Sequence, residues 1–311
     1  MTEGVRGIVL AHLSDPHLPL PAGVRPSEVL NKRLLSLLSW HVSRHRRHRR
    51  DTLDRLVADL RAKAPGLIAV TGDLTNLGLD TEYDQAAAWL KTLGDPARVM
   101  VIPGNHDALV PGAWPRGAVK WWPWWQADGA APAPVADAFP VLRRRGPLAL
   151  IGTSSAVATM PGLAVGEVGR AQLRRLADLL TLTRAEGLCR VLMVHHPPLD
   201  GTVKARKRLR DAAALRAVLA REGVELVLHG HSHRSHVQQI ETADGPASVI
   251  GVPSASSMYH EPAAYNLYHI VPGPGGWAMR LVTRQLAPHG DAETAQCLSL
   301  SLARGHAARA V

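Results

Sequence analysis

Short apolar runs alternate with longer amphipathic stretches along most of the chain, and this alternation most constrains the fold. The runs that we expect to form strands are residues 7–13, 67–71, 98–102, 148–151, 190–194 and 225–228. The stretches with helical spacing are residues 51–63, 81–93, 167–186 and 209–221. Strands that alternate with helices indicate a layered α/β domain, because each helix covers one face of a sheet. After His236 strand-length runs separated by Gly and Pro predict antiparallel hairpins.

The length and composition indicate a globular protein with a full core. The chain has 311 residues, of which 46% are hydrophobic and 20% are charged, as in a folded domain rather than a disordered or membrane-embedded chain. Its two cysteines are too few for a disulfide framework, and no apolar run approaches the ~18 residues of a membrane span. The apolar run at residues 8–13 is also too short for the core of a signal peptide. We therefore expect free thiols and a cytoplasmic location.

The same pattern predicts the domain organisation. We expect residues 1–286 to form a single domain that carries two insertions, a basic helix at about residues 18–50 and a Trp-rich segment at about residues 110–135. Residues 287–311 show no informative pattern, so we expect them to form a C-terminal tail that frays.

The positive charge of the chain is local. The net charge is +10, yet residues 25–50 contain eight basic side chains and one acidic side chain, and residues 204–210 contain five basic side chains and no acid. The rest of the chain is therefore slightly acidic. Two basic patches on such a body favour a local anionic partner, and they disfavour general binding of nucleic acid, for which the sequence shows no module.

Polar motifs follow five of the expected strands. They are Asp15-Pro16-His17, Gly72-Asp73, Gly104-Asn105-His106-Asp107, His195-His196-Pro197 and Gly230-His231-Ser232-His233. Ligands of open α/β sheets bind outside the carboxyl ends of the strands. Each motif alone is more typical of a turn or of a structural hydrogen-bond pair. Together they bring carboxylate, amide and imidazole groups to one edge without cysteine, which predicts a site for hard or borderline divalent cations.

In this order the five motifs resemble those of the calcineurin-like metallophosphoesterase superfamily. The His-His-Pro-Pro form and the final Gly-His-x-His-Arg are most similar to its bacterial branch of cyclic-nucleotide and glycerophosphodiester phosphodiesterases. The resemblance covers residues 8–234. It implies an α/β fold, the four-layer αββα sandwich of two mixed sheets, with a dinuclear metal centre between the strand ends.

The resemblance also implies a ligand set for two divalent metal ions, which would be Mn, Fe, Zn or Co. The residues that it assigns to one ion are Asp15, His17 and His233. The residues that it assigns to the other ion are Asn105, His195 and His231. Asp73 would bridge the two ions.

The reaction that the resemblance implies is hydrolysis of a phosphate ester. A hydroxide that bridges the ions would attack phosphorus, and the ions would stabilise the charge that grows on the phosphoryl oxygens. His106 would contact the substrate and protonate the leaving group, with Asp107 orienting its ring. His196 would lie next to the ligands, where it is also a candidate substrate contact.

The basic insertion has two interpretations. Leu30, Leu34, Leu37 and Leu38 recur at helical spacing before the basic run at residues 44–50. One interpretation is a helix that packs on the domain and has a solvated basic end. The other is a surface for an anionic partner, either a polyanionic substrate or lipid headgroups at the inner membrane surface, contacted through residues 25–50.

Two further segments could contact the substrate. After the third motif, a stretch of twelve residues contains five tryptophans: Trp114, Trp121, Trp122, Trp124 and Trp125. One interpretation is a substrate wall, a lid or a membrane contact, with Trp124 as the candidate substrate contact. The other interpretation is a small packing cluster. The basic loop at residues 204–210 predicts either a solvated loop or a phosphate clamp that includes Lys204 and Arg206.

These observations leave three functions. The first is a phosphodiesterase for a small diester, such as a cyclic nucleotide or a glycerophosphodiester. The second is a hydrolase of a lipid-linked phosphate or pyrophosphate at a membrane surface, and the third is a non-catalytic scaffold of the same fold, which the intact ligand set disfavours. Leu109 stands where many close diesterase relatives have an arginine two positions after Gly-Asn-His-Asp, so that substrate contact does not carry over.

Overall fold

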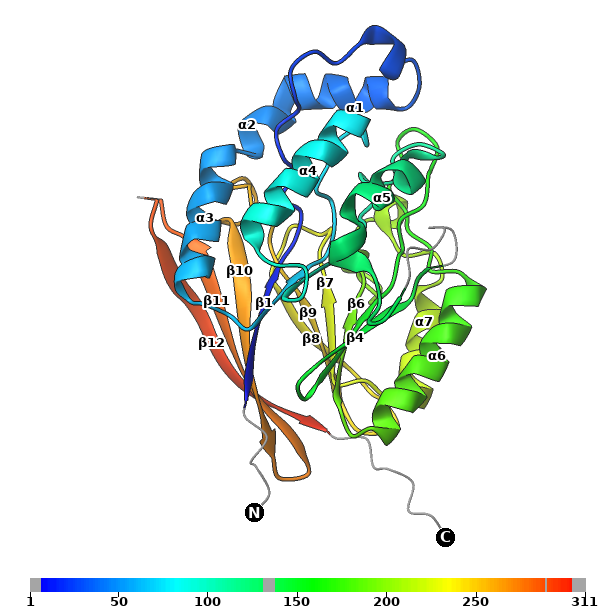
Figure 1. Ribbon diagram of the computed structural model, residues 1–311, viewed down its shortest axis with the longest axis vertical. Coiled ribbons are helices and arrows are strands. Elements are labelled where there is room, and N and C mark those ends of the chain that lie inside the picture. The colour runs from blue at the N-terminus through cyan, green and yellow to red at the C-terminus, as the bar shows by residue number, and fades with distance from the viewer. Residues whose placement is uncertain (1–6, 131–137, 289, 304–311) are drawn as a thin grey trace.

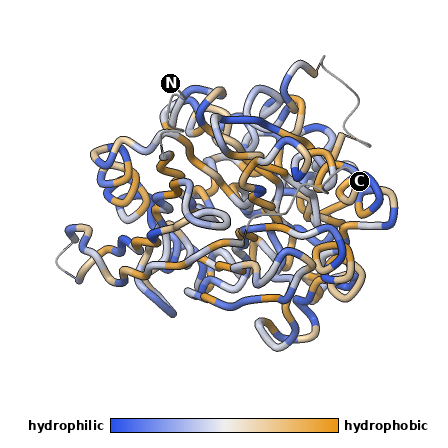
Figure 2. Tube along the Cα trace, turned by 90° about the horizontal axis from the view of Figure 1, so that it is seen from below, coloured by the Kyte–Doolittle hydropathy of each residue, from blue (hydrophilic) through white to orange (hydrophobic). Residues whose placement is uncertain are grey.

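Two six-stranded sheets pack face to face, with helices on both outer surfaces (Figure 1). The computed structural model describes residues 7–130, 138–288 and 290–303. The expected four-layer αββα sandwich of two mixed sheets is confirmed. Figure 2 shows that apolar segments gather in the interior of the molecule, as burial of the inner sheet faces requires.

The first sheet has the order β12-β11-β10-β1-β2-β3. Its strands are β1 (Ile8–Leu13), β2 (Leu67–Val70), β3 (Val99–Val101), β10 (Ala264–Gly273), β11 (Gly276–Leu286) and β12 (Ala292–Ala303). β1, β2 and β3 are parallel, so their carboxyl ends meet at one edge. β10 pairs antiparallel with β1 and continues into the β10–β11 hairpin, as the sequence predicts for this part of the chain.

The second sheet has the order β4-β5-β6-β7-β9-β8. Its strands are β4 (Val141–Arg145), β5 (Leu148–Gly152), β6 (Cys189–Met193), β7 (Leu226–His229), β8 (His236–Ile240) and β9 (Ala247–Gly251). β5, β6, β7 and β9 are parallel. All four are buried along their length, which explains why they read in the sequence as nearly continuous apolar runs.

The helices cover the outer faces of the sheets. α3 (Arg50–Ala62) packs on the β10, β11 and β12 side, and α4 (Asp80–Leu93) packs beside α5 (Ala113–Trp125), which contacts β3. α6 (Arg170–Ala185) and α7 (Ala212–Glu222) cover the second sheet. Among the residues that the structure describes, no helix combines the length and the apolar character needed to cross a bilayer.

The expected C-terminal tail is wrong. Residues 292–303 form β12, which pairs along the whole of β11 and completes the edge of the first sheet. Leu298, Leu300 and Leu302 alternate with polar residues, and this period of two places all three leucines against the core. Residues 304–311 lie outside the described part of the chain.

The basic insertion folds into a helical segment across one end of the sandwich. It contains α1 (Arg33–Ser39), a π-helical turn (Trp40–Arg44) and α2 (His45–Arg47), and we call residues 26–49 the cap. The Arg33 guanidinium donates to the Leu77 carbonyl at 2.8 Å, and the Arg49 amide donates to the Ser256 carbonyl at 2.9 Å. These bonds fix both ends of the cap, while only part of the predicted leucine stripe packs inward.

The Trp-rich insertion is a packing cluster in the structure. Trp121 and Trp125 are fully buried on α5, and the Trp121 indole donates to the Tyr83 carbonyl of α4 at 3.1 Å. The proposed substrate contact by Trp124 is wrong: its side chain is 4% exposed, and its indole donates to the Gly94 carbonyl at 3.3 Å. Burial of this area stabilises the α4–α5 pair. Residues 131–135 of the predicted insertion lie outside the described residues.

Candidate metal centre

The ends of five strands bring the predicted ligands together. The residues that follow β1, β2 and β3 of the first sheet are Asp15, His17, Asp73 and Asn105. The residues that follow β6 and β7 of the second sheet are His195, His231 and His233. The side chains therefore meet where the two sheets face each other, as the sequence predicts from their position at strand ends.

The backbone at these residues is strained. Six residues other than glycine have a positive φ among the described residues, and five of the six are predicted ligands: Asp15, His17, Asp73, His231 and His233. Such conformations cost of order 1–3 kcal/mol each and persist where the surrounding structure enforces them. The Asp15 amide donates to the Gly72 carbonyl and the His17 amide to the Asp73 carbonyl, both at 3.0 Å, and these bonds hold two of the turns together. Strain concentrated at one set of side chains indicates a functional site.

One group of side chains consists of Asp15, His17 and His233. One possible ligand atom of each lies within 4.8 Å of those of the other two. The Asp15 carboxylate accepts a hydrogen bond from the His231 amide at 2.9 Å, and His233 Nε2 lies 3.1 Å from Asp15 Oδ1. Residues 218 positions apart in the chain are thus in direct contact.

A second group consists of Asp73, His195 and His231, which satisfy the same distance criterion. Asn105 belongs with it, because its Oδ1 lies 3.3 Å from His195 Nε2. Asp73 lies between the two groups: its Oδ2 is 3.4 Å from His195 Nε2 and 3.8 Å from His17 Nε2. The grouping matches the division of ligands that the resemblance implies.

The rings of three of these histidines are oriented by backbone carbonyls. His17 Nδ1 faces the Thr75 carbonyl at 3.2 Å, His195 Nδ1 faces the Thr71 carbonyl at 2.6 Å, and His231 Nε2 faces the Lys207 carbonyl at 3.0 Å. Histidines that ligate metals are usually held in this way through their second ring nitrogen. One nitrogen of each ring is left to face the other ligands.

The electrostatics suit cations. Burial, with Arg44 as the next cause, holds the pKa of His17 well below its usual range, and burial followed by His196 does the same for the pKa of His231. Both rings are therefore neutral, which is the form that binds metals. Buried oxygen and nitrogen donors without thiolate fit two divalent cations of the Zn, Mn or Fe type.

Asp107 has partners that the sequence does not predict. Its carboxylate accepts hydrogen bonds from the backbone amides of Asp73, Gly104 and Thr75 at 2.8–2.9 Å, and also from the Thr75 hydroxyl. The ring of His106 is held instead through Nδ1, which lies 2.8 Å from the Asn76 carbonyl. The expected orientation of His106 by Asp107 is therefore wrong, because this carboxylate ties together the turns after β2 and β3.

His106 lines the cavity next to the ligands, as predicted. Its Nε2 lies 3.1 Å from Nη1 of Arg44, a side chain of the cap, and Nη2 of the same guanidinium lies 3.1 Å from His17 Nδ1. Burial and then Arg44 lower the pKa of His106 to about 3, so its ring is neutral in this arrangement. Within the described parts of the chain, no carboxylate lies within salt-bridge distance of the Arg44 guanidinium.

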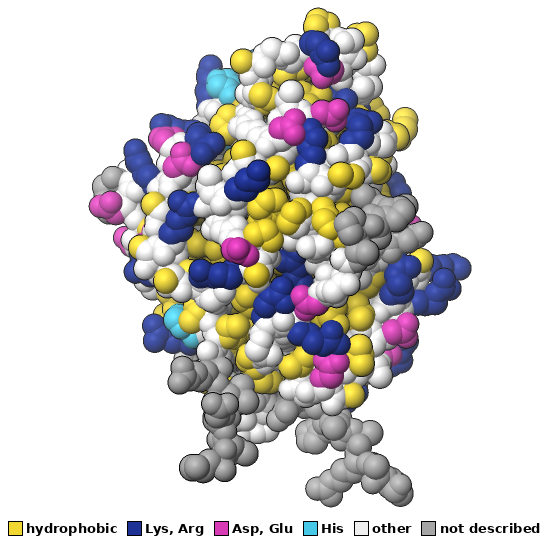
Figure 3. All heavy atoms as spheres, viewed as in Figure 1, with side chains coloured by type: hydrophobic (Ala, Val, Ile, Leu, Met, Phe, Trp, Pro, Cys, Tyr) yellow, Lys and Arg dark blue, Asp and Glu magenta, His cyan; other side chains and the backbone are white. Residues whose placement is uncertain are grey.

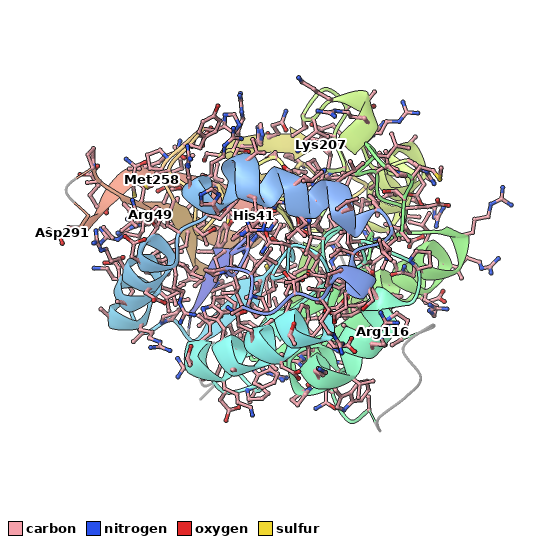
Figure 4. All side chains as sticks on the ribbon, turned by 90° about the horizontal axis from the view of Figure 1, so that it is seen from above. His41, Arg49, Arg116, Lys207, Met258 and Asp291 are labelled. Atoms are coloured by element: carbon pink, nitrogen blue, oxygen red, sulfur yellow. The ribbon has the colours of Figure 1, made fainter. Side chains whose placement is uncertain are left out.

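The cavity over these groups has a volume of about 390 Å³ and a cationic wall. Arg44 and Arg47 come from the cap, while Arg206 and Lys207 come from the loop after β6. Figure 4 shows the cap crossing this face of the molecule with Lys207 alongside it. Of the two predicted clamp residues, Arg206 lines the cavity and the exposed Lys204 does not.

His196 does not line the cavity. Its ring is buried behind His231, with centroids 4.4 Å apart, and is fixed by the Ser155 hydroxyl and the Ala164 carbonyl. The predicted substrate contact by His196 is therefore wrong, while its place next to the ligands agrees with the structure. Sequence reasoning missed Arg44, Arg47 and Lys207 as cavity residues, and the only signal for them is the density of basic residues in the two insertions.

Comparisons with known proteins agree with this geometry. A family model described as calcineurin-like phosphoesterase matches residues 8–235. A protein of Synechococcus sp. named as a probable cyclic nucleotide phosphodiesterase is 26% identical over 236 residues, which are 75% of this chain and 76% of that protein.

Two solved structures are similar over most of the chain. A dimetal phosphatase from Danio rerio has a TM-score of 0.59 at 14% identity and matches 94% of this chain and 99% of that one. Purple acid phosphatase PPD1 from yellow lupin has a TM-score of 0.57 at 11% identity and matches 95% of this chain and 54% of that one. At such identities the likeness shows the shared fold.

Proposed function

The chain belongs to the calcineurin-like phosphoesterase family and is a metal-dependent hydrolase of phosphate esters that uses two divalent ions, and from this premise we propose that its substrate is a phosphodiester. The Synechococcus relative, named for cyclic nucleotides, supports a diester. The cavity volume of about 390 Å³ suits a nucleotide-sized molecule, since small-molecule sites occupy roughly 300–1,000 Å³.

In this proposal the two groups of ligands hold one ion each. Asp15, His17 and His233 would hold the first, Asn105, His195 and His231 would hold the second, and Asp73, which lies between the two groups, would contribute to both. Two such ions, when bound, lower the pKa of coordinated water and offset negative charge on the phosphoryl group. The neutral rings and the carbonyls behind them position the ligand atoms.

The observation that carries the proposal is the Arg44 guanidinium. Among the described residues its side-chain partners are the imidazoles of His17 and His106, and a half-buried cation with no carboxylate in salt-bridge contact favours an anion beside it. We assign it to a phosphoryl oxygen of the substrate, in place of the arginine that Leu109 replaces. His106 lies on the other side of the same guanidinium, and with Nδ1–H held by the Asn76 carbonyl it would protonate the leaving oxygen after Nε2 takes up a proton from water.

The experiment compares hydrolysis rates across substrates. Protein loaded separately with Mn, Zn, Co or Fe is assayed with a linear diester, cyclic nucleotides, a glycerophosphodiester and a matched monoester. We expect higher kcat/KM for a diester than for the monoester with the same leaving group. The reverse order with every metal would refute the diester assignment, and no hydrolysis of any substrate by metal-loaded protein would favour the scaffold.

Variants test the residue roles. Asn105→Ala should lose bound metal and turnover together, and His106→Ala should keep its metal and lose about 10²–10⁴ in turnover of a substrate with a poor leaving group. Asp178→Asn on the outer face of α6 is the control and should match the wild type. Wild-type turnover by either site variant would contradict its role.

A second candidate function is hydrolysis of a lipid-linked phosphate or pyrophosphate at a membrane surface. One observation favours it, the apolar outer face of the cap next to the cationic cavity.

A further inference from the structure

The outer face of the cap exposes an unusual number of large apolar side chains. Five of those exposed in the described structure lie within thirteen consecutive residues: Leu30, Leu34, Leu35, Leu38 and Val42. Figure 3 shows hydrophobic side chains at this end of the molecule with Lys and Arg among them. Both ends of the cap are hydrogen-bonded to the domain, so these leucines are exposed in a fixed segment. A clustered apolar surface of this kind indicates an interaction site.

The charge around these side chains is mainly positive. Residues 29–50 contain no Asp or Glu, and the exposed Arg46 and Arg49 lie beside the apolar residues, with Arg49 in an ion pair with Asp51. Next to Val42 a groove is lined by Arg46, Arg49, Met258 and Tyr259. The Arg47 guanidinium lies 3.7 Å from the centroid of the Tyr259 ring and bridges this groove to the catalytic cavity. Apolar and cationic side chains on one helical face are typical of surfaces that bind anionic lipid.

The catalytic cavity continues under the cap. A groove of about 210 Å³ shares Arg44, His106 and Lys207 with that cavity and then passes Leu35, Leu109 and Leu163. The cationic end suits a phosphate, and the leucine-lined part suits an apolar chain. One molecule that satisfies both is an amphiphile with a phosphoester head.

We propose that the outer face of the cap docks on an anionic lipid bilayer and that the site takes an amphiphilic phosphoester from that bilayer. This inference deepens the proposed function and rests on it for the reaction. Docking places Leu38 and Val42 in the interface and Arg46 and Arg49 among the lipid headgroups. The groove past Leu35 then opens toward the lipid, so a substrate reaches the ligands without leaving the bilayer surface completely.

Vesicle binding without substrate tests the docking. The full chain is sedimented with vesicles of phosphatidylcholine alone and of phosphatidylcholine mixed with phosphatidylglycerol. We expect binding to the mixed vesicles that weakens with salt. The double variant L38D/V42D should bind at least about tenfold more weakly, because it replaces apolar side chains by anions at the interface.

The control carries the same substitutions elsewhere. V119D/L182D changes residues of α5 and α6 whose exposures, 69% and 46%, are close to the 74% of Val42 and the 52% of Leu38. It should bind as the wild type does. In the same way R46Q/R49Q should weaken binding and reduce its salt dependence, while R170Q/R174Q on α6 should not.

Hydrolysis of a water-soluble diester separates this inference from the proposed function. L38D/V42D should keep that activity, because neither residue lines the catalytic cavity, and should lose rate only on a diacyl phosphoester presented in mixed vesicles. Equal vesicle binding by L38D/V42D and V119D/L182D, or no binding by the wild type at low salt, would overturn docking even if the diester is cleaved. A dimer in solution that L38D/V42D dissociates would also overturn it, in favour of a second copy of the chain.

Discussion

Replacing Arg44 by alanine tests whether the cap contributes to the reaction. The guanidinium presents Nη1 to His106 and Nη2 to His17, both at 3.1 Å, so a phosphoryl oxygen bound over the ligands lies within reach of the same two groups. A hydrogen bond between a charged group and its partner contributes about 1.5–3 kcal/mol. At about 1.4 kcal/mol per factor of ten, Arg44→Ala should lower kcat/KM for a diester about 10- to 100-fold.

The stability of the variant separates binding from folding. Because Arg44 has no carboxylate partner among the described residues, its removal breaks no ion pair there, and the midpoint of thermal unfolding should not fall. Arg44→Lys should recover part of the lost kcat/KM, since lysine restores the charge but not the two-pronged geometry.

Arg46→Ala provides the matched control, two residues along the same cap. Its side chain is exposed and lies outside the catalytic cavity. We expect unchanged kcat/KM for the water-soluble diester, measured at a fixed salt concentration. The reasoning is refuted if Arg44→Ala keeps the wild-type kcat/KM, or if it loses no more than Arg46→Ala.

Three further predictions follow from burial and linkage. Trp124→Ala should lower the free energy of unfolding, measured with denaturant, by about 3–5 kcal/mol, while kcat and KM for the diester stay constant. A variant with normal stability and an altered KM would contradict this. Arg190 is fully buried between Glu225 at 2.6 Å and Asp244 at 2.8 Å. Arg190→Met leaves the buried Glu225 without its cation, while Asp244 keeps Arg184, and should cost about 3–5 kcal/mol by the same measurement. Removing bound metal with a chelator should lower the midpoint of thermal unfolding, because a metal ion present at a thousand times its Kd stabilises the folded protein by about 4 kcal/mol. The same midpoint in metal-loaded and metal-stripped protein would argue against the site.

The strands and the ligands could be predicted because buried parallel strands leave a strong signal. The expected run at residues 67–71 is β2 over Leu67–Val70, and the run at residues 190–194 is β6 over Cys189–Met193. β2 is apolar throughout and β6 is apolar except for the ion-paired Arg190, and both end in polar motifs, since each strand is buried until its carboxyl end. The position of Asp73 and His195 at one edge follows from that topology.

The cap could not be predicted in the same way. Its residues at helical spacing are apolar on the exposed side as well as on the packed side, and the π-helical turn at Trp40–Arg44 changes which side chains face the domain. The sequence therefore shows a dense positive charge around Arg44 without showing that this guanidinium points at His106.

The tryptophans did carry a usable signal. Trp114, Trp121 and Trp125 are spaced by seven and four residues, so they share one face of a helix, and all three are buried on α5. A shared helical face favours packing over a lid. The role of Asp107 was inaccessible for another reason, because its partners are backbone amides of the turn after β2, and a sequence motif does not record which backbone groups a side chain meets.

The distribution of the ligands over the chain has a consequence for how the protein matures. Asp15, His17, Asp73 and Asn105 are synthesised within the first 105 residues of the chain, whereas His231 and His233 come after both helices of the second sheet. A nascent chain thus carries all three oxygen donors, with His17, long before the other three imidazole ligands exist. Each complete ligand group therefore forms only when the second sheet docks on the first, so we expect a destabilised second sheet to lower the metal content of the full-length protein.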